Sequence, residues 1–264
     1  MRPQKLTSAL DNADFKGALS RIRLVATDMD GTLTAEGKFT PELLGALSAL
    51  RRHGIEVLVV TGRSAGWVSG LVHYLPITGA IAENGGIYLH EKLAEPLILP
   101  DIPRMSQHRD RLGNVFARLQ GQYPHLRPAA DNAYRITDWT FDVAGLEAED
   151  LAWMQQTCAA QSMGFTYSTV QCHIKVVRQK KAAGLARVLK EHFAALSAAE
   201  VVTVGDSPND VSLFSPEQFP YSVGVANVKN YLPTLTYVPA YITDKPEVAG
   251  FLELADQLIA AREG

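Results

Sequence analysis

Two aspartates stand two residues apart in DMDGTLT, residues 28–34, directly after an apolar run. This spacing suits phosphoryl transfer, because Asp28 can attack phosphorus while Asp30 protonates the departing oxygen and then activates water. Two carboxylates repel a phosphate, so the chemistry needs a hard cation, and Mg²⁺ held by carboxylates and water fits. An EF-hand loop is excluded, since its sixth and twelfth positions should be Gly and Glu and are Leu33 and Phe39. A plain acidic turn is the remaining alternative.

Three further segments have residue types that suit a phosphate site. In TGRS, residues 61–64, the hydroxyl of Thr61 beside a helix N-terminus can donate to a phosphate oxygen, although Gly and Ser are also ordinary turn residues. Lys180 and Lys181 open a predicted helix, where a cation costs about 0.3–1 kcal/mol against the helix dipole. A bound anion would remove that cost, so this position favours a lysine that faces a phosphate.

The fourth segment is GDSPND, residues 205–210, which follows the apolar run VVTV. Asp206 is expected at the end of this strand. Asp210 has two interpretations, because Ser207 as N-cap, Pro208 at the first helical position and a carboxylate three residues after the cap also form a capping box. A supporting role at a metal site and a capping role can coexist.

The elements that would position these segments are short buried strands alternating with amphipathic helices. Continuous Val, Ile and Leu runs are typical of strands covered on both faces, as in parallel sheets. Strand–helix–strand alternation implies right-handed crossovers, so we predict an α/β fold with a Rossmann-like, doubly wound parallel sheet. The predicted strands cover residues 22–27, 55–61, 79–82, 201–204, 221–225 and 240–242.

Between residues 87 and 177 the pattern changes to helices with two alternating strands, in YRITDWTFDV and FTYSTVQCHIKVV. We therefore predict a core domain of residues 1–86 plus 178–264 and an inserted α+β cap domain of residues 87–177. Residues 1–20 have only a weak apolar pattern and are treated as an uncertain N-terminal arm.

Taken together, the four segments resemble the motifs of the haloacid dehalogenase (HAD) superfamily, in order and at successive strand ends. The second aspartate of DMDGT is typical of the phosphatase and phosphomutase branches. The insert between the second and third motifs resembles that of subfamily IIB, which has a C2B-type cap. That group includes Cof-type sugar phosphatases, sucrose-phosphatase-like enzymes, phosphomannomutase and archaeal-type phosphoglycolate phosphatases.

The resemblance implies a role for each matching residue. Asp28 would be the nucleophile and Asp30 the general acid and base. The sequence KAAGL resembles the third motif, which selects Lys181 over Lys180. Mg²⁺ is implied as the cofactor, held by Asp28, the Asp30 backbone carbonyl and Asp206 with Asp210 in support. The implied phosphate-binding residues are Thr61, Gly62, Lys181 and Asn209.

Candidate substrate residues come from the predicted cap and its approach. In VQCHIKVV the side chains alternate, so Cys172 and Ile174 share one face while His173 and Lys175 lie on the other. We expect the apolar face to pack on cap helices and the polar face to overhang the cleft, although a solvated strand face would alternate in the same way. The candidates for binding the leaving group are His173, Lys175, Arg135, Glu83 and Asn84.

Composition excludes several classes of protein. The formal net charge of −3 argues against a nucleic-acid binder, and the chain has no apolar run long enough for a membrane span. Two cysteines are too few for a disulfide framework or a zinc site. The first twenty residues lack the continuous apolar segment of a secretory signal, so a cytoplasmic location is expected. The expected function is a Mg²⁺-dependent phosphatase acting on a small phosphorylated metabolite, such as a sugar phosphate or phosphoglycolate. A phosphomutase and a non-catalytic phosphometabolite-binding protein are the alternatives, and the sequence leaves the oligomeric state open.

Overall fold

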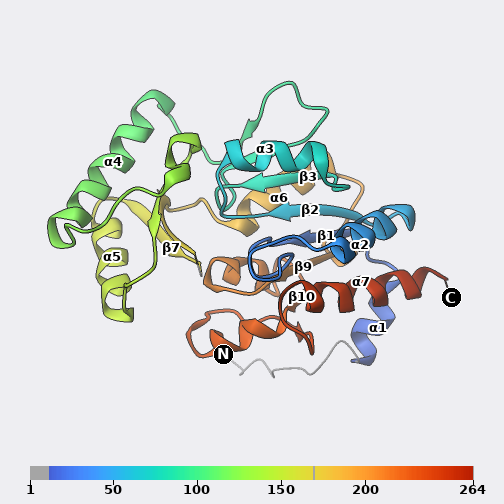
Figure 1. Cartoon of the computed structure of the whole chain (residues 1–264). Helices are drawn as coiled ribbons and strands as arrows, with labels where there is room; N and C mark the ends of the chain where they lie inside the picture. The colour runs from blue at the N-terminus through green and yellow to red at the C-terminus, as the bar shows by residue number, and fades with distance from the viewer. Residues whose placement is uncertain (1–11, 169, 264) are drawn as a thin grey trace.

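The core of the molecule is one eight-stranded sheet, shown in a computed structural model that describes residues 12–168 and 170–263 (Figure 1). The strand order is β11-β10-β9-β1-β2-β3-β4-β5, and all six predicted strands are present and mutually parallel. The strands are β1 (Leu24–Thr27), β2 (Glu56–Val60), β3 (Gly79–Ala82), β4 (Ile87–Leu89), β5 (Leu97–Ile98), β9 (Val201–Gly205), β10 (Tyr221–Gly224) and β11 (Tyr241–Ile242).

Helices cover both faces of this sheet, which confirms the doubly wound fold. Alternate strand residues face opposite layers, so Val25 packs in one apolar cluster while Leu24 and Ala26 pack in the other. The first layer contains α1 (Ala13–Leu19), α2 (Pro41–Arg52), α3 (Ala65–Tyr74) and α7 (Glu247–Glu263), and the second contains α6 (Lys181–His192).

Local sequence explains where these elements begin. Helix α2 starts with Pro41 at its first position, and the Thr40 hydroxyl accepts a hydrogen bond from the Leu43 amide. Part of the predicted arm is the helix α1, whose Phe15 is buried and stacks on Tyr241 with ring centroids 4.2 Å apart. Residues 1–11 lie outside the described part of the chain.

The cap is a separate layer at one end of the molecule (Figure 1). It contains an antiparallel sheet of order β6-β8-β7, formed by β6 (Asp138–Asp142), β7 (Met163–Tyr167) and β8 (Gln171–Val176). The helices α4 (Met105–Gln122) and α5 (Ala148–Ala160) share an apolar cluster with it. Two strands were predicted, but FTYSTVQCHIKVV forms both β7 and β8.

The core sheet extends past residue 86, so the predicted boundary of the cap is corrected. Strands β4 and β5 lie within the range assigned to the cap, yet β4 pairs antiparallel with β3 and β5 with β4. The turn before β4 explains this, because Glu83, Asn84 and Gly85 all have positive φ, a conformation that reverses the chain into a hairpin. The Asn-Gly pair therefore marks a core hairpin, and the chain enters the cap after it.

Five short 310 helices complete the described structure: Ala130–Tyr134, Ala198–Glu200, Pro208–Phe214, Ala226–Asn230 and Leu232–Thr234. None of the helices in the part of the chain that the structure describes combines the length and apolar character needed to cross a membrane.

Candidate active site

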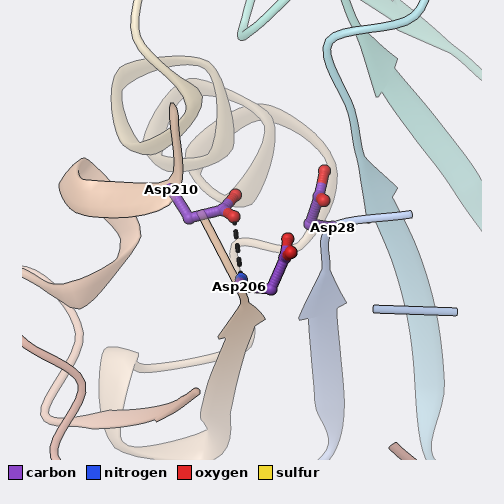
Figure 2. A group of neighbouring side chains, drawn as sticks. All are labelled: Asp28, Asp206 and Asp210. Atoms are coloured by element: carbon purple, nitrogen blue, oxygen red, sulfur yellow. Dashed lines mark hydrogen bonds between the residues drawn. The ribbon is translucent and has the colours of Figure 1, made fainter. Parts of the chain in front are cut away.

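Three carboxylates meet at the carboxyl edge of the core sheet (Figure 2). Strands β1 and β9 are neighbours in register, with Thr27 beside Val204, so Asp28 and Asp206 leave the sheet side by side. Asp210 follows from the 310 helix Pro208–Phe214. One oxygen from each carboxylate lies within 4.8 Å of the others, and all three residues are buried.

Glycine is required at position 31 for this approach. Gly31 has a φ of +79°, and a Cβ there would lie 2.5 Å from Oδ2 of Asp206. A side chain would therefore meet both backbone strain and a collision with a carboxylate. The Asp-Met-Asp-Gly segment thus lets the loop after β1 pack directly against the second aspartate.

Lys181 lies among the carboxylates at the start of α6. Its ammonium group contacts the carboxylate of Asp28 and lies 2.7 Å from Oδ1 of Asp210. Lys180, the other lysine of the pair, is exposed. The anionic neighbours offset the cost of a cation at a helix N-terminus, which explains why a buried lysine is tolerated there.

Asp210 has a structural role that occupies both of its oxygens. Oδ2 accepts hydrogen bonds from the backbone amides of Asp206 and Ser207, at 3.0 and 3.1 Å, while Oδ1 faces Lys181. The predicted capping box with Ser207 is present. Asp210 therefore shapes the turn after β9 and holds the lysine.

Burial makes negative charge costly in this cluster. Burial and the neighbouring Asp210 raise the pKa of Asp28 from its usual 3.8 to about 7, although Lys181 opposes the rise. Burial and Asp28 likewise raise the pKa of Asp206 well above its usual value. Burial disfavours the charged form of Lys181, but Asp210 and Asp28 outweigh it and raise the pKa of this lysine. When ionised, the three carboxylates of the cluster therefore carry more negative charge than the single positive charge of Lys181 neutralises.

The carboxylate of Asp30 binds Arg63 instead of Lys181, an ion pair that the sequence did not reveal. Arg63 holds its carboxylate through two hydrogen bonds, from Nε to Oδ2 at 2.9 Å and from Nη2 to Oδ1 at 2.6 Å. Both side chains are partly exposed, and the guanidinium also lies over the Trp67 ring, 5.3 Å from its centroid. The one signal in the sequence for this role of Arg63 was its place in the TGRS segment, beside Thr61 and Gly62.

The turn between β2 and α3 brings Thr61 and Gly62 to the same edge. The Thr61 hydroxyl is buried and accepts a hydrogen bond from the Arg63 amide at 3.1 Å, and Ser64 caps α3. Gly62 lies against two other side chains, since a Cβ there would be 3.2 Å from both Nδ2 of Asn84 and Cε1 of His173.

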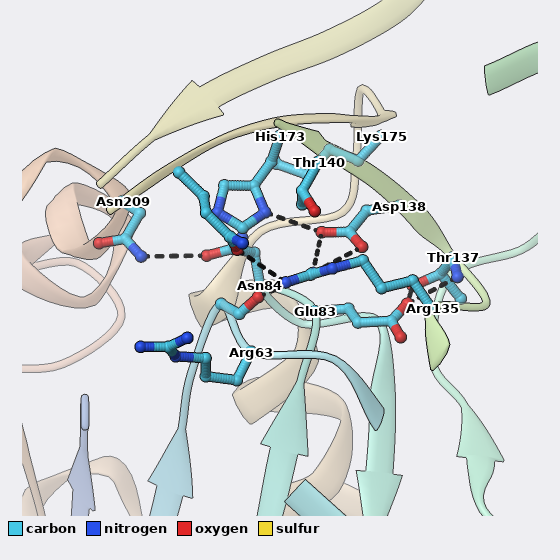
Figure 3. Close-up of polar contacts among 12 residues, drawn as sticks. Arg63, Glu83, Asn84, Arg135, Thr137, Asp138, Thr140, His173, Lys175 and Asn209 are labelled. Atoms are coloured by element: carbon cyan, nitrogen blue, oxygen red, sulfur yellow. Dashed lines mark hydrogen bonds and ion pairs between the residues drawn. The ribbon is translucent and has the colours of Figure 1, made fainter. Parts of the chain in front are cut away.

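Two asparagines join the core loops beside this turn. Asn209 donates from Nδ2 to Oδ1 of Asn84 at 3.2 Å (Figure 3). Nδ2 of Asn84 is buried and has no hydrogen-bond partner among the residues that the structure describes. A buried donor without a partner costs about 1–3 kcal/mol, which a ligand acceptor would recover.

The face alternation predicted for β8 is present. Cys172 and Ile174 pack in the apolar cluster of the cap. His173 lies on the other face, where it lines a cavity together with Asp28 and Asp30. Lys175 donates to the backbone carbonyl of Gln179 and lines a second cavity, which also reaches Lys181.

Two of the expected substrate residues instead connect the cap to the core. Glu83 accepts hydrogen bonds from the amides of Ala65, Ile136 and Thr137 and from the Thr137 hydroxyl. The guanidinium of Arg135 donates to the Gly62 carbonyl and to three cap side chains, those of Asp131, Asp138 and Gln171. These protein partners occupy both groups, so neither presents a free polar atom to a substrate.

The cavity above Asp28 is small. Its volume is about 20 Å³, and its lining includes Asp30, Gly62, Arg63 and His173. A space of this size holds about one water molecule.

Comparisons with known proteins agree with this geometry. The sequence profile of the haloacid dehalogenase-like hydrolases matches residues 25–105. The phosphoglycolate phosphatase of Metallosphaera sedula is 30% identical over 246 residues, which cover 90% of this chain and 100% of the relative.

Solved structures share the fold. A protein from Thermoplasma acidophilum superposes with a TM-score of 0.73 at 20% identity, covering 90% of this chain and 98% of its own. A HAD subclass IIB sugar phosphatase superposes with a TM-score of 0.62 at 16% identity, covering 84% of this chain and 93% of its own. The chain therefore belongs to the haloacid dehalogenase-like hydrolase family, and it is a phosphatase that hydrolyses phosphoric monoesters.

Proposed function

We propose that the protein is a Mg²⁺-dependent phosphatase whose substrate is a small phosphorylated acid of the size of 2-phosphoglycolate. The observation that carries this proposal is the buried cluster at the sheet edge, in which Lys181 bridges Asp28 and Asp210 beside Asp206. The names of relatives such as the Metallosphaera sedula enzyme support the same substrate class.

In this proposal the reaction has two chemical steps. An oxygen of Asp28 attacks phosphorus, the P–O bond to the leaving group breaks, and Asp30 gives that oxygen a proton. Asp30 then takes a proton from water as the water attacks the aspartyl-phosphate, which releases inorganic phosphate and frees Asp28. Asp30 lines the same cavity as Asp28, and because both of its oxygens accept hydrogen bonds from Arg63, one of them must leave the guanidinium before it exchanges a proton with the leaving group or with water.

The phosphoryl oxygens would be held by groups from three loops. The Thr61 hydroxyl and the backbone of Gly62 come from the turn after β2, and Asn209 comes from the loop after β9. Lys181 supplies the positive charge and neutralises charge that builds up in the transition state. All four side chains or backbone groups meet at the carboxyl edge, where open α/β sheets bind ligands.

The residues present fit a hard divalent cation. Asp28 and Asp206 are buried carboxylates with raised pKa values, so their ionised forms need a counter-charge beyond Lys181. We assign Asp28, Asp206 and the backbone carbonyl of Asp30 as ligands, with Asp210 in support through the Asp206 amide. The bound Mg²⁺ would neutralise the phosphate and polarise its oxygens.

The leaving group would lie under the cap. His173 and Asn84 flank Gly62, and Lys175 adds positive charge to the neighbouring cavity, which Asn84 also lines. Arg135 and Glu83 act in this proposal by holding the cap in place rather than by touching the substrate.

The test is phosphate release from a panel of compounds: 2-phosphoglycolate, ethyl phosphate and glucose 6-phosphate. We expect turnover with Mg²⁺, none with EDTA, and the highest kcat/KM for 2-phosphoglycolate. An Asp28→Asn variant serves as the matched blank. Transfer of phosphate between sugar positions without net release, or turnover that persists in Asp28→Asn, would overturn the proposal.

A further inference from the structure

Asp138 is a buried carboxylate of the cap that the reaction described above does not use. It lies at the start of β6 and is fully buried. Its Oδ2 is 2.9 Å from Nδ1 of His173, and its Oδ1 accepts a hydrogen bond from Nη1 of Arg135 at 2.9 Å (Figure 3). One carboxylate thus binds His173, which lines the cavity over Asp28, and Arg135, which reaches the Gly62 turn.

The two partners of Asp138, Arg135 and His173, both contact the core domain at Gly62. Nη1 of Arg135 also donates to the backbone carbonyl of Gly62 at 2.9 Å. The ring of His173 lies against Gly62 as well, since a Cβ there would be 3.3 Å from Nε2. Asp138 is therefore linked to the phosphate-binding turn in two ways, once through Arg135 and once through His173.

We propose that Asp138 is a positioning residue, which fixes the His173 ring so that Nε2 faces the leaving group and anchors the Gly62 turn through Arg135. The inference rests on the proposed phosphatase function and adds a residue to it. The leaving-group chemistry that such a histidine recognises is a carboxylate.

The chemistry of the contact requires an acid at this position. A carboxylate can only accept, so its partner Nδ1 must carry the proton and Nε2 is left to face the substrate. Although burial opposes ionisation of Asp138, Arg135 and His173 lower its pKa, so it is charged. Burial lowers the pKa of His173 and outweighs the opposing effect of Asp138, so the ring is mostly neutral in the free protein, and a substrate carboxylate at Nε2 would be the second anion that favours the imidazolium. An imidazolium donates a charge-assisted hydrogen bond, which is about twice as strong as a neutral one.

Asp138→Asn separates positioning from packing. The amide oxygen still accepts from Arg135, but the amide nitrogen donates to Nδ1 of His173, which reverses that hydrogen bond and removes the charge. The matched control is Thr140→Val on the same strand. Thr140 is buried, pairs with His173 in the sheet register, and has a hydroxyl without a partner among the described residues.

The decisive experiment is a double-mutant cycle of Asp138→Asn and His173→Ala in the full chain, with kcat and KM measured on two substrates. 2-Phosphoglycolate carries the carboxylate, and ethyl phosphate replaces it with a methyl group. We expect each single variant to raise KM for 2-phosphoglycolate by about 10- to 100-fold, as for one charged hydrogen bond. The double variant should be no worse than His173→Ala, because coupled residues are not additive.

Equal losses on both substrates, additive losses, or no loss would overturn the positioning role. Thr140→Val should match the wild type on both compounds. Hydrolysis of ethyl phosphate by the variants would show that the phosphatase function stands even if the positioning role fails. Absence of phosphate release from the wild type would instead refute the proposed function.

A second measurement does not depend on whether the variants fold. Nitrogen-15 NMR of the wild-type protein reports which ring nitrogen of His173 carries the proton. A protonated Nδ1 supports the inference, and an Nδ1 without a proton overturns it.

Discussion

The strongest consequence for stability concerns Asp28. In the metal-free protein, burial and Asp210 raise its pKa from 3.8 to about 7. A carboxyl group with a raised pKa favours the folded state fully at low pH, and that contribution is lost as the pH rises through the folded-state value. The difference between 3.8 and about 7 corresponds to about 4 kcal/mol at about 1.36 kcal/mol per unit.

Asp28→Asn removes this titration and should stabilise the metal-free protein at neutral pH. We expect the free energy of unfolding of the variant, relative to the wild type, to increase from about pH 4 to about pH 7, by up to about 4 kcal/mol, and then to level off. Urea unfolding followed by circular dichroism in EDTA measures both proteins across this range. Asp142→Asn, at an exposed position of β6, is the matched control.

A difference between the wild type and Asp28→Asn that stays constant with pH would refute the reasoning. Mg²⁺ provides a second check, because a ligand that binds only the folded state stabilises it by mass action. Adding Mg²⁺ should stabilise the wild type more than the variant, which lacks one anionic ligand. Equal stabilisation of the two would contradict the assignment of Asp28 to the metal site.

Three further changes have expected outcomes. Lys181→Met should lower kcat/KM for 2-phosphoglycolate by about 10²- to 10³-fold in a phosphate-release assay, since a preorganised charge at the phosphoryl group is lost; near-normal turnover would contradict its role. Glu83→Gln should lower the free energy of unfolding, measured in urea, by about 1–3 kcal/mol, because an amide cannot accept hydrogen bonds from all of the donors around this carboxylate. Unchanged stability would contradict the role of Glu83 in connecting the cap to the core. Phe141→Ala should lower the free energy of unfolding by about 3–5 kcal/mol in the same assay, since the ring of Phe141 is fully buried in the cap. A much smaller loss would mean that the apolar core of the cap collapses into the cavity left by the ring.

The sequence was sufficient for the parts of the site that follow from strand ends. Buried apolar runs predicted the parallel strands, and parallel strands bring their carboxyl ends to one edge, so Asp28 and Asp206 had to be close. A lysine at a helix N-terminus needs an anion, so one of Lys180 and Lys181 was expected at the site, and the resemblance of KAAGL to the third HAD motif selected Lys181. Apart from that choice, these inferences depend on local pattern and sheet geometry alone.

The remaining contacts depend on how the cap sits on the core. Arg135 and Gly62 are 73 positions apart, and no periodicity links them. The same holds for the ion pair of Asp30 with Arg63, which needs two loops at a particular separation. In the sequence, Asp138 is simply one polar position in the alternating pattern of a strand. Its burial becomes visible only when Arg135 and His173 converge on it.

The central claim is that Asp28 is phosphorylated during turnover. Acid quenching of the enzyme during turnover of 2-phosphoglycolate, followed by peptide mass spectrometry, locates a trapped acyl phosphate. We expect phosphate on the peptide that contains Asp28 and none on that peptide in Asp28→Asn. Phosphate on another residue, or rapid turnover with no phosphorylated peptide, would contradict it.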